Sequence, residues 1–143
     1  MLDLLEAKRM RYATWQPVFH RPSPGAKEGQ RPYLSSLCSN PDFICLTSEE
    51  AGAVTGFLQG RIVSAPPVYD PGGTVLMIDD FVVADENLWP TTGRALVDKA
   101  RTIAKSGGAA LVNVVCGPND HPKRMMLLDA GLTVASEWLV APA

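Results

Sequence analysis

Runs of apolar and β-branched residues predict the strands of this chain. Two of them are separated by the polar Ser48-Glu49-Glu50, which predicts a β-hairpin. The most extended run is rich in β-branched residues, and another is continuously apolar, which is typical of a strand covered on both faces. The predicted strands lie at residues 43–47, 53–63, 74–84, 109–116 and 133–140.

Helical spacing of apolar residues predicts helices at residues 3–15, 33–38, 91–105 and 120–130. Between 17 and 32, prolines and glycines interrupt any regular element, so we expect a loop that can hold one helical turn. Gly107 and Gly131 follow the last turns of their helices, and Asp120 is expected to cap the final helix.

This order of elements predicts a fold of the α/β (α+β) class, with one mixed sheet between helices. The length of 143 residues corresponds to a single domain over residues 1–143. With 46% hydrophobic and 20% charged residues, the composition is that of an ordinary globular protein and not of a disordered one.

Charge and cysteine content exclude several classes of function. A formal net charge of −2 offers no basic surface for nucleic acid, so no nucleic-acid partner is expected. No run approaches the ~20 apolar residues of a membrane span, and the start of the chain does not resemble a signal peptide. Three cysteines without C-x-x-C spacing and two histidines support neither a disulfide framework nor a metal site. We therefore expect a cytoplasmic protein without a membrane partner.

The candidate chemistry lies where the predicted strand 74–84 passes through a polar loop into the predicted helix 91–105. A strand that leads into a helix presents free backbone amides and the positive end of the helix dipole, which together bind anions. Thr91, Thr92 and Arg94 add hydroxyl and guanidinium donors at this junction.

Here the sequence resembles the GCN5-related N-acetyltransferase (GNAT) superfamily. Residues 88–93 occupy the position of the family's Q/R-x-x-G-x-G/A loop, with Gly93 as its last glycine, and Arg94-Ala95-Leu96 follow. The second family motif, a strand, a break with Asn and a helix ending in Gly-Phe, is similar to residues 111–132. The acidic strand 78–83 is similar to one that polyamine-type members place beside the acetyl group.

The chain also departs from the family pattern at three points. Almost nothing precedes Asp3, where the family has its first strand, and only one strand is predicted after the last helix, where the family has two. Leu127 stands where a tyrosine often protonates the leaving thiolate. The resemblance therefore implies a central mixed, largely antiparallel sheet flanked by helices that lacks the first and last family strands.

The resemblance implies roles for particular residues. The backbone of Phe81, Val82 and Val83 would pair with the pantetheine arm of acetyl-CoA, the cosubstrate, and the amides of Thr91, Thr92, Gly93 and Arg94 would hold its pyrophosphate. Asn119 and Asp120 occupy the family's Asn position.

The adjacent Asp79 and Asp80 are candidates for catalysis. Adjacent side chains on a strand point to opposite faces, so only one of them is expected to face the substrate, as an ammonium anchor or a base acting through water. The alternative is an ordinary structural charge. His121 is a further candidate acid or base. A Cys116–His121 nucleophile is conceivable, but a buried, inert cysteine is the stronger interpretation.

The leading hypothesis is an enzyme, an N-acetyltransferase that transfers the acetyl group to a primary amine of a small molecule or peptide by direct attack. The alternatives are a non-catalytic relative that binds acyl-CoA or a protein partner, and an unrelated α/β nucleotide-binding domain. Because the missing strands leave sheet edges uncovered, we also expect a homodimer that pairs or packs through residues 133–140.

Overall fold

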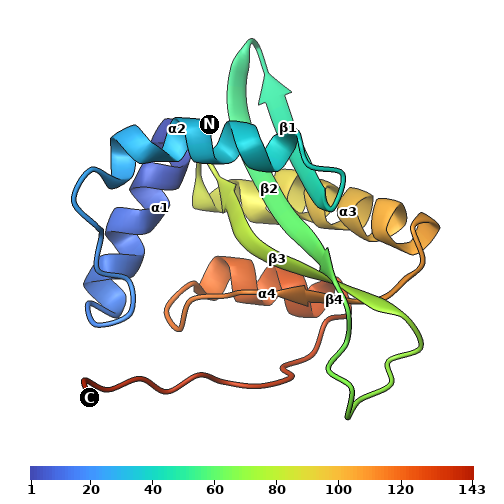
Figure 1. The fold of residues 1–143 in the computed structure, drawn as a ribbon. Helices are drawn as coiled ribbons and strands as arrows, with labels where there is room; N and C mark the ends of the chain where they lie inside the picture. Colours follow the sequence, from blue (N-terminus) through green and yellow to red (C-terminus); the bar gives the residue numbers. More distant parts are fainter.

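The computed structural model describes residues 1–143 and places four helices around one four-stranded sheet (Figure 1). No helix in it has both the length and the apolar character needed to cross a membrane. In chain order the elements are α1 (Leu2–Trp15), α2 (Ala26–Cys38), β1 (Phe43–Glu50), β2 (Ala53–Val63), β3 (Thr74–Val83), a 3₁₀ turn (Glu86–Leu88), a π-helical turn (Trp89–Gly93), α3 (Arg94–Ser106), β4 (Ala109–Val114) and α4 (His121–Asp129).

The sheet has the order β1-β2-β3-β4 and is mixed, as predicted. The first three strands pair antiparallel, whereas β4 runs parallel to β3. Pairing between β3 and β4 reaches only Ile78 opposite Val114, followed by one hydrogen bond from the Val115 amide to the Ile78 carbonyl at 2.9 Å. Beyond Ile78, β3 therefore has no strand neighbour on this side.

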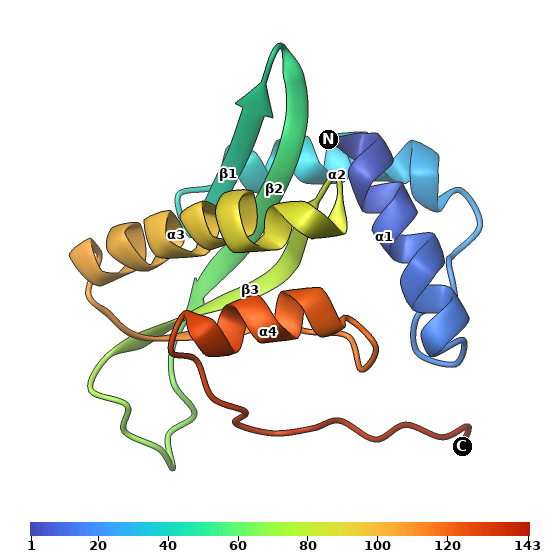
Figure 2. The same cartoon turned by 180° about the vertical axis from the view of Figure 1, so that it is seen from behind.

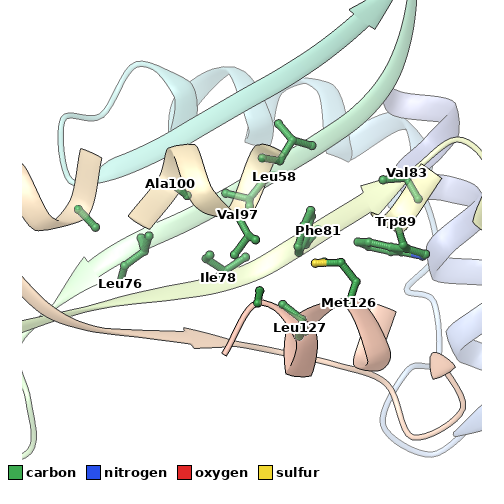
Figure 3. Packing of buried hydrophobic residues seen from close by; sticks show 13 residues of the cluster. Leu58, Leu76, Ile78, Phe81, Val83, Trp89, Val97, Ala100, Met126 and Leu127 are labelled. Carbon is green, nitrogen blue, oxygen red and sulfur yellow. The ribbon is translucent and has the colours of Figure 1, made fainter. Parts of the chain in front are cut away.

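Helices cover both faces of the sheet. The pair α1 and α2 lies on one face, and the pair α3 and α4 lies on the other, as the opposite views in Figures 1 and 2 show. The larger core cluster joins α3 and α4 to the sheet and includes Phe81, Trp89 and Val97 (Figure 3). A smaller cluster, formed by Leu5, Leu34, Phe57 and Val82, joins α1 and α2 to the opposite face.

Two predicted elements are wrong. Residues 133–140 form no strand: they lie outside every ladder, and Trp138 and Leu139 are 80% and 96% exposed. The apolar pattern is present there, but the segment has neither a hydrogen-bonding neighbour nor a covered face. The predicted loop before residue 33 is wrong over 26–32, because α2 begins at Ala26 and includes Pro32.

Candidate functional site

The strand β3 contains a β-bulge at the two candidate aspartates. Gln59 of β2 pairs with Asp80, while the next residue, Gly60, pairs with Ile78, so Asp79 is the extra residue. A bulge interrupts the alternation of side chains along a strand. Ile78 and Phe81 are accordingly three residues apart and still lie in the same core cluster.

Because of this bulge, the prediction that the two aspartates point to opposite faces is wrong. Asp79 and Asp80 border the same open hollow, between β3, α1 and the segment that follows α1. We call it the acidic hollow; its volume of about 640 Å³ is in the range of small-molecule sites. Its lining also includes Lys8, Tyr12, Phe19, His20, Tyr33 and Val115.

The two aspartates differ in their partners. Lys8 donates to the Asp80 carboxylate at 2.7 Å and to the Asp79 carbonyl at 3.0 Å. The Asp79 carboxylate has no such ion pair, and its pKa is raised, first by burial and then by the neighbouring charge of Asp80. Asp79 is therefore a better proton acceptor than an ordinary aspartate.

Aromatic side chains surround the acidic hollow. The ring of His20 lies edge-on to Tyr12 and Phe19, at centroid distances of 5.2 and 5.0 Å. Burial lowers the pKa of His20, and the charge of Lys8 lowers it further, which favours the neutral imidazole. The hollow thus combines aromatic walls with two aspartates, of which Asp80 is paired with Lys8, and Arg9 and Arg21 also line it. The Asp79 carboxylate and the aromatic rings are the groups that suit a cationic amine.

Lys123 lies at the place where β3 and β4 part. Its side chain is fully buried, and its Nζ donates to the carbonyl of Val115 at 2.7 Å and to that of Phe81 at 3.4 Å. The ammonium also lies 5.3 Å from the ring centre of Phe81 and 5.7 Å from that of Trp89. Burial lowers the pKa of Lys123 to about 8.

Asp120 does not cap α4 as predicted. It stands at the N-cap position, but its side chain makes no capping bond and instead accepts from the Tyr12 hydroxyl at 2.8 Å. The same hydroxyl accepts from the Gly117 amide at 3.2 Å. This buried contact ties α1 to the loop before α4 and positions both near the acidic hollow.

The predicted anion-binding loop is helical in the structure. Its helical path starts at Glu86, where the Asp85 carboxylate accepts from the Asn87 amide at 2.8 Å. Inside the path, the Arg94 amide donates to the Trp89 and Thr91 carbonyls, so it is not free for a phosphate. The Arg94 guanidinium donates to Asp98 at 2.6 Å and to the Asp129 carbonyl at 3.4 Å.

A second hollow, which we call the helix-start hollow, lies beside this path and has a volume of about 500 Å³. It lies between the start of α3 and α4, and its lining includes Glu86, Asn87, Trp89, Arg94, Met126 and Asp129. The lining holds one arginine and two acids, Glu86 and Asp129, and the arginine is paired with Asp98 outside the lining, so the hollow as it stands offers an anion no net attraction.

The other predicted site residues are spread around these features. Thr91 is exposed, Thr92 is half-buried, and Gly93 is packed directly against the Trp89 ring. Asn119 and His121 are exposed before and at the start of α4, and neither lines a hollow described above. The predicted residues therefore divide between the aspartate side and the helix-start side.

Sequence reasoning missed Lys8, His20 and Lys123. For Lys8 and His20 no local pattern existed, because α1 and the following loop meet β3 only through the fold. Lys123 did leave a signal: it lies three and four residues before Met126 and Leu127, on the buried stripe of α4. A lysine on an apolar stripe indicates a buried cation.

Comparison with known proteins gives a match at the level of the fold only, since no protein-family model and no curated protein matches the sequence. A mutant BH1408 protein from Bacillus halodurans superposes with a TM-score of 0.81 at 11% identity, covering 99% of this chain and 90% of that one. An aminoglycoside 6′-N-acetyltransferase from Acinetobacter haemolyticus gives 0.68 at 10% identity, covering 90% of this chain and 89% of the other. A ribosomal-protein-alanine N-acetyltransferase from Brucella melitensis biovar Abortus gives 0.63 at 12% identity, covering 96% and 94%.

Proposed function

Because the chain has the fold of the GCN5-related N-acetyltransferases, we propose that it transfers an acetyl group from acetyl-CoA to a primary amine. The observation that carries this proposal is the opening of the sheet beyond Ile78, where β3 has a free edge directly beside the acidic hollow. A free edge can pair with an extended acyl donor, and the hollow can hold an amine next to it.

Asp79 is proposed as the group that binds and deprotonates the amine. Asp80 is already paired with Lys8, which leaves the Asp79 carboxylate for the incoming ammonium. Its raised pKa makes Asp79 a better base, either directly or through one water molecule. The neutral amine then attacks the thioester carbonyl, and a backbone amide of β3 stabilises the oxyanion.

The donor side of the site is proposed at Phe81, Val82 and Val83 and at the helix start. The backbone of the three β3 residues would pair with the pantetheine arm. Thr91, Thr92, Gly93 and Arg94, together with Asn119, would lie near the phosphates. The ion pair between Arg94 and Asp98 is half-exposed, so the guanidinium can exchange it for a phosphate at modest cost.

The acceptor is proposed to be a small molecule or peptide with a cationic amine next to an apolar or aromatic group. The Asp79 carboxylate would attract the ammonium, and Tyr12, Phe19 and His20 offer rings to the remainder. His121 is exposed at the start of α4 and stays a secondary candidate acid or base.

A second candidate function, a non-catalytic acyl-CoA-binding or protein-interaction relative, is favoured by one observation. The Asp98 carboxylate holds the Arg94 guanidinium, and the Arg94 amide donates to the Trp89 and Thr91 carbonyls, so both phosphate-binding groups of Arg94 already have partners. Such a relative would bind a donor or a partner protein without turnover.

The test of the proposed function combines ligand binding with turnover. Acetyl-CoA, coenzyme A and ATP are compared by thermal shift, because a ligand that binds only the folded state raises its stability. Thiol release from acetyl-CoA is then measured with tryptamine, phenethylamine, spermidine and kanamycin as acceptors. We expect stabilisation by both coenzyme A compounds and not by ATP, and turnover with at least one amine.

Asp79→Asn is the diagnostic variant. It should lower kcat about 100-fold or more, the usual contribution of a general base, while the affinity for coenzyme A stays unchanged. Asp42→Asn, at an exposed aspartate whose side chain forms no hydrogen bond, is the matched control. Stabilisation by coenzyme A without any thiol release would favour the non-catalytic relative, and no stabilisation at all would contradict both.

We further propose that the chain acts as a single cytoplasmic domain and forms a homodimer. The exposed apolar side chains of Val134, Trp138 and Leu139 offer a surface that a second copy would cover. A monomer at micromolar concentration in sedimentation equilibrium would contradict the dimer.

A further inference from the structure

Lys123 lies between the acidic hollow and the helix-start hollow. Its ammonium donates to the carbonyl of Val115, which lines the acidic hollow, and lies over the ring of Trp89, which lines the helix-start hollow. If the amine occupies the first hollow and the acyl donor extends from the second, the reacting atoms meet between them. Lys123 is the only lysine in the molecule with a fully buried side chain, and it lies at that point.

The ammonium is not part of a structural ion pair. No carboxylate lies within 4 Å of it. Burial lowers its pKa, the charge of Lys8 lowers it further, and Cys116, Asp120 and Asp80 raise it from a distance. Such an unpaired buried charge costs stability, whereas a methionine or leucine would fill the same space at lower cost. A residue that is unfavourable for the fold is a candidate for function.

The hydrogen bonds of the ammonium leave one donor free. Lysine carries three N–H groups, and only two acceptors, the carbonyls of Val115 and Phe81, lie within reach. Apart from these carbonyls the ammonium lies near only the rings of Phe81 and Trp89, so the third N–H is the donor that an atom arriving with a ligand would engage. Since both carbonyls belong to the strand ends that part here, that atom would lie at the mouth of the opening between β3 and β4.

We propose that Lys123 is the acid of the acyl transfer and gives its third N–H proton to the sulfur of the departing coenzyme A. This inference rests on the proposed function. When the tetrahedral adduct collapses, the carbon–sulfur bond breaks, the sulfur keeps the electron pair and takes a proton from Nζ, and Lys123 is left as a neutral amine. Lys123 recovers a proton from solvent, while the proton lost by the attacking amine leaves through Asp79.

The acidity of Lys123 suits this step. Burial brings its pKa to about 8, close to the value of ~8.5 for a simple thiol, so transfer to a thiolate is nearly balanced. An exposed lysine holds its proton about two units more tightly and would be a poorer donor. Leu127, one turn further along α4, cannot donate a proton.

Lys123→Gln is the diagnostic variant, because its amide can still donate to both carbonyls but cannot give up a proton. Acetyl-CoA turnover is followed as free thiol, with the amine that reacts best or with water as the acceptor. We expect kcat to fall about 100-fold or more, the KM for acetyl-CoA to stay within about threefold, and the alkaline limb of kcat near pH 8 to disappear. Lys105→Met, at an exposed lysine of α3, is the control and should keep both the rate and the limb.

Lys123→Met is a second variant in case Lys123→Gln does not fold. Circular dichroism shows whether each variant is folded. A wild-type rate and alkaline limb in either folded variant overturns the role of Lys123 and leaves the acetyltransferase proposal intact. Absence of both coenzyme A binding and thiol release in the wild-type protein overturns the proposed function and this inference with it.

Discussion

Replacing Lys123 with methionine should change how the stability of this protein depends on pH. The folded state holds Lys123 at a pKa of about 8, against 10.5 in an exposed side chain. Between these values the unfolded chain binds a proton that the folded protein has already lost, so the wild-type free energy of unfolding rises with pH. The variant lacks this contribution.

The size of the effect follows from the shift. At 1.36 kcal/mol for each pKa unit, the lowered pKa corresponds to about 3 kcal/mol in all, of which about 2 to 3 kcal/mol develops between pH 7 and pH 10. The quantity to compare is the free energy of unfolding of the wild type minus that of Lys123→Met. Groups whose pKa does not depend on Lys123, such as Tyr12, are common to both proteins and largely cancel in the difference. Cys116 does not cancel fully, because burial raises its pKa and the charge of Lys123 partly offsets that rise.

Urea unfolding followed by tryptophan fluorescence measures this difference, because Trp89 is 1% exposed and its ring lies beside the Lys123 ammonium. Titrations at half-unit steps from pH 6.5 to pH 10.5 should give a difference that is flat at first and then rises. A difference that stays constant within about 0.5 kcal/mol across this range would refute the reasoning, because it would mean that Lys123 keeps the acidity of an exposed lysine.

Three other substitutions test the packing around the site. Gly93→Ala should cost about 1–3 kcal/mol, since the new Cβ would lie 2.5 Å from the Trp89 ring, and thermal unfolding measures it. Gly29→Ala is its control: this exposed helical glycine has nothing within 4 Å, so the change should stabilise α2 by about 0.5–1 kcal/mol. Tyr12→Phe should cost about 2 kcal/mol or more at pH 7, because it removes the hydrogen bond to the buried carboxylate of Asp120. Burial raises the pKa of Tyr12, so the wild-type advantage is complete below about pH 10 and should shrink above it in urea titrations.

Much of the fold could be predicted from local patterns. Apolar runs predict the hairpin of β1 and β2 and the strands β3 and β4, and helical spacing of apolar residues predicts α3. These apolar side chains are buried whichever element packs against them, so no knowledge of the neighbours was needed. Residues 133–140 show why such patterns fail: a strand needs a partner, and no pattern within a segment indicates whether one is present. Pro32 led to the wrong prediction of a loop at 26–32, because tertiary packing again decided the outcome. The burial of Leu34 and Leu37 stabilises α2, and the helix tolerates the one hydrogen bond that Pro32 cannot form.

The site was less predictable than the fold. The motif analysis singled out Asp79 and Asp80, and strict alternation assigned them to opposite faces. The bulge that breaks this alternation is decided by pairing with β2, which no local pattern contains. Lys8 reaches Asp80 across 72 residues of chain, a contact that only tertiary structure creates. Lys123 could have been noticed, since a charge on a buried stripe conflicts with the rest of α4.

The extra residue in β3 also bears on how this protein can change in evolution. Because of the bulge, Ile78 before it and Phe81 after it point to the same core face. The core therefore depends on these two residues and not on the two residues between them. Substitutions at 79 and 80 can alter the charge offered to an acceptor while the apolar face against α3 and α4 stays the same. A deletion of Asp79 would leave Ile78 and Phe81 two positions apart, and simple alternation would still keep both on the core face. The core therefore does not require the extra residue, whose effect is to bring the Asp79 and Asp80 side chains to one hollow.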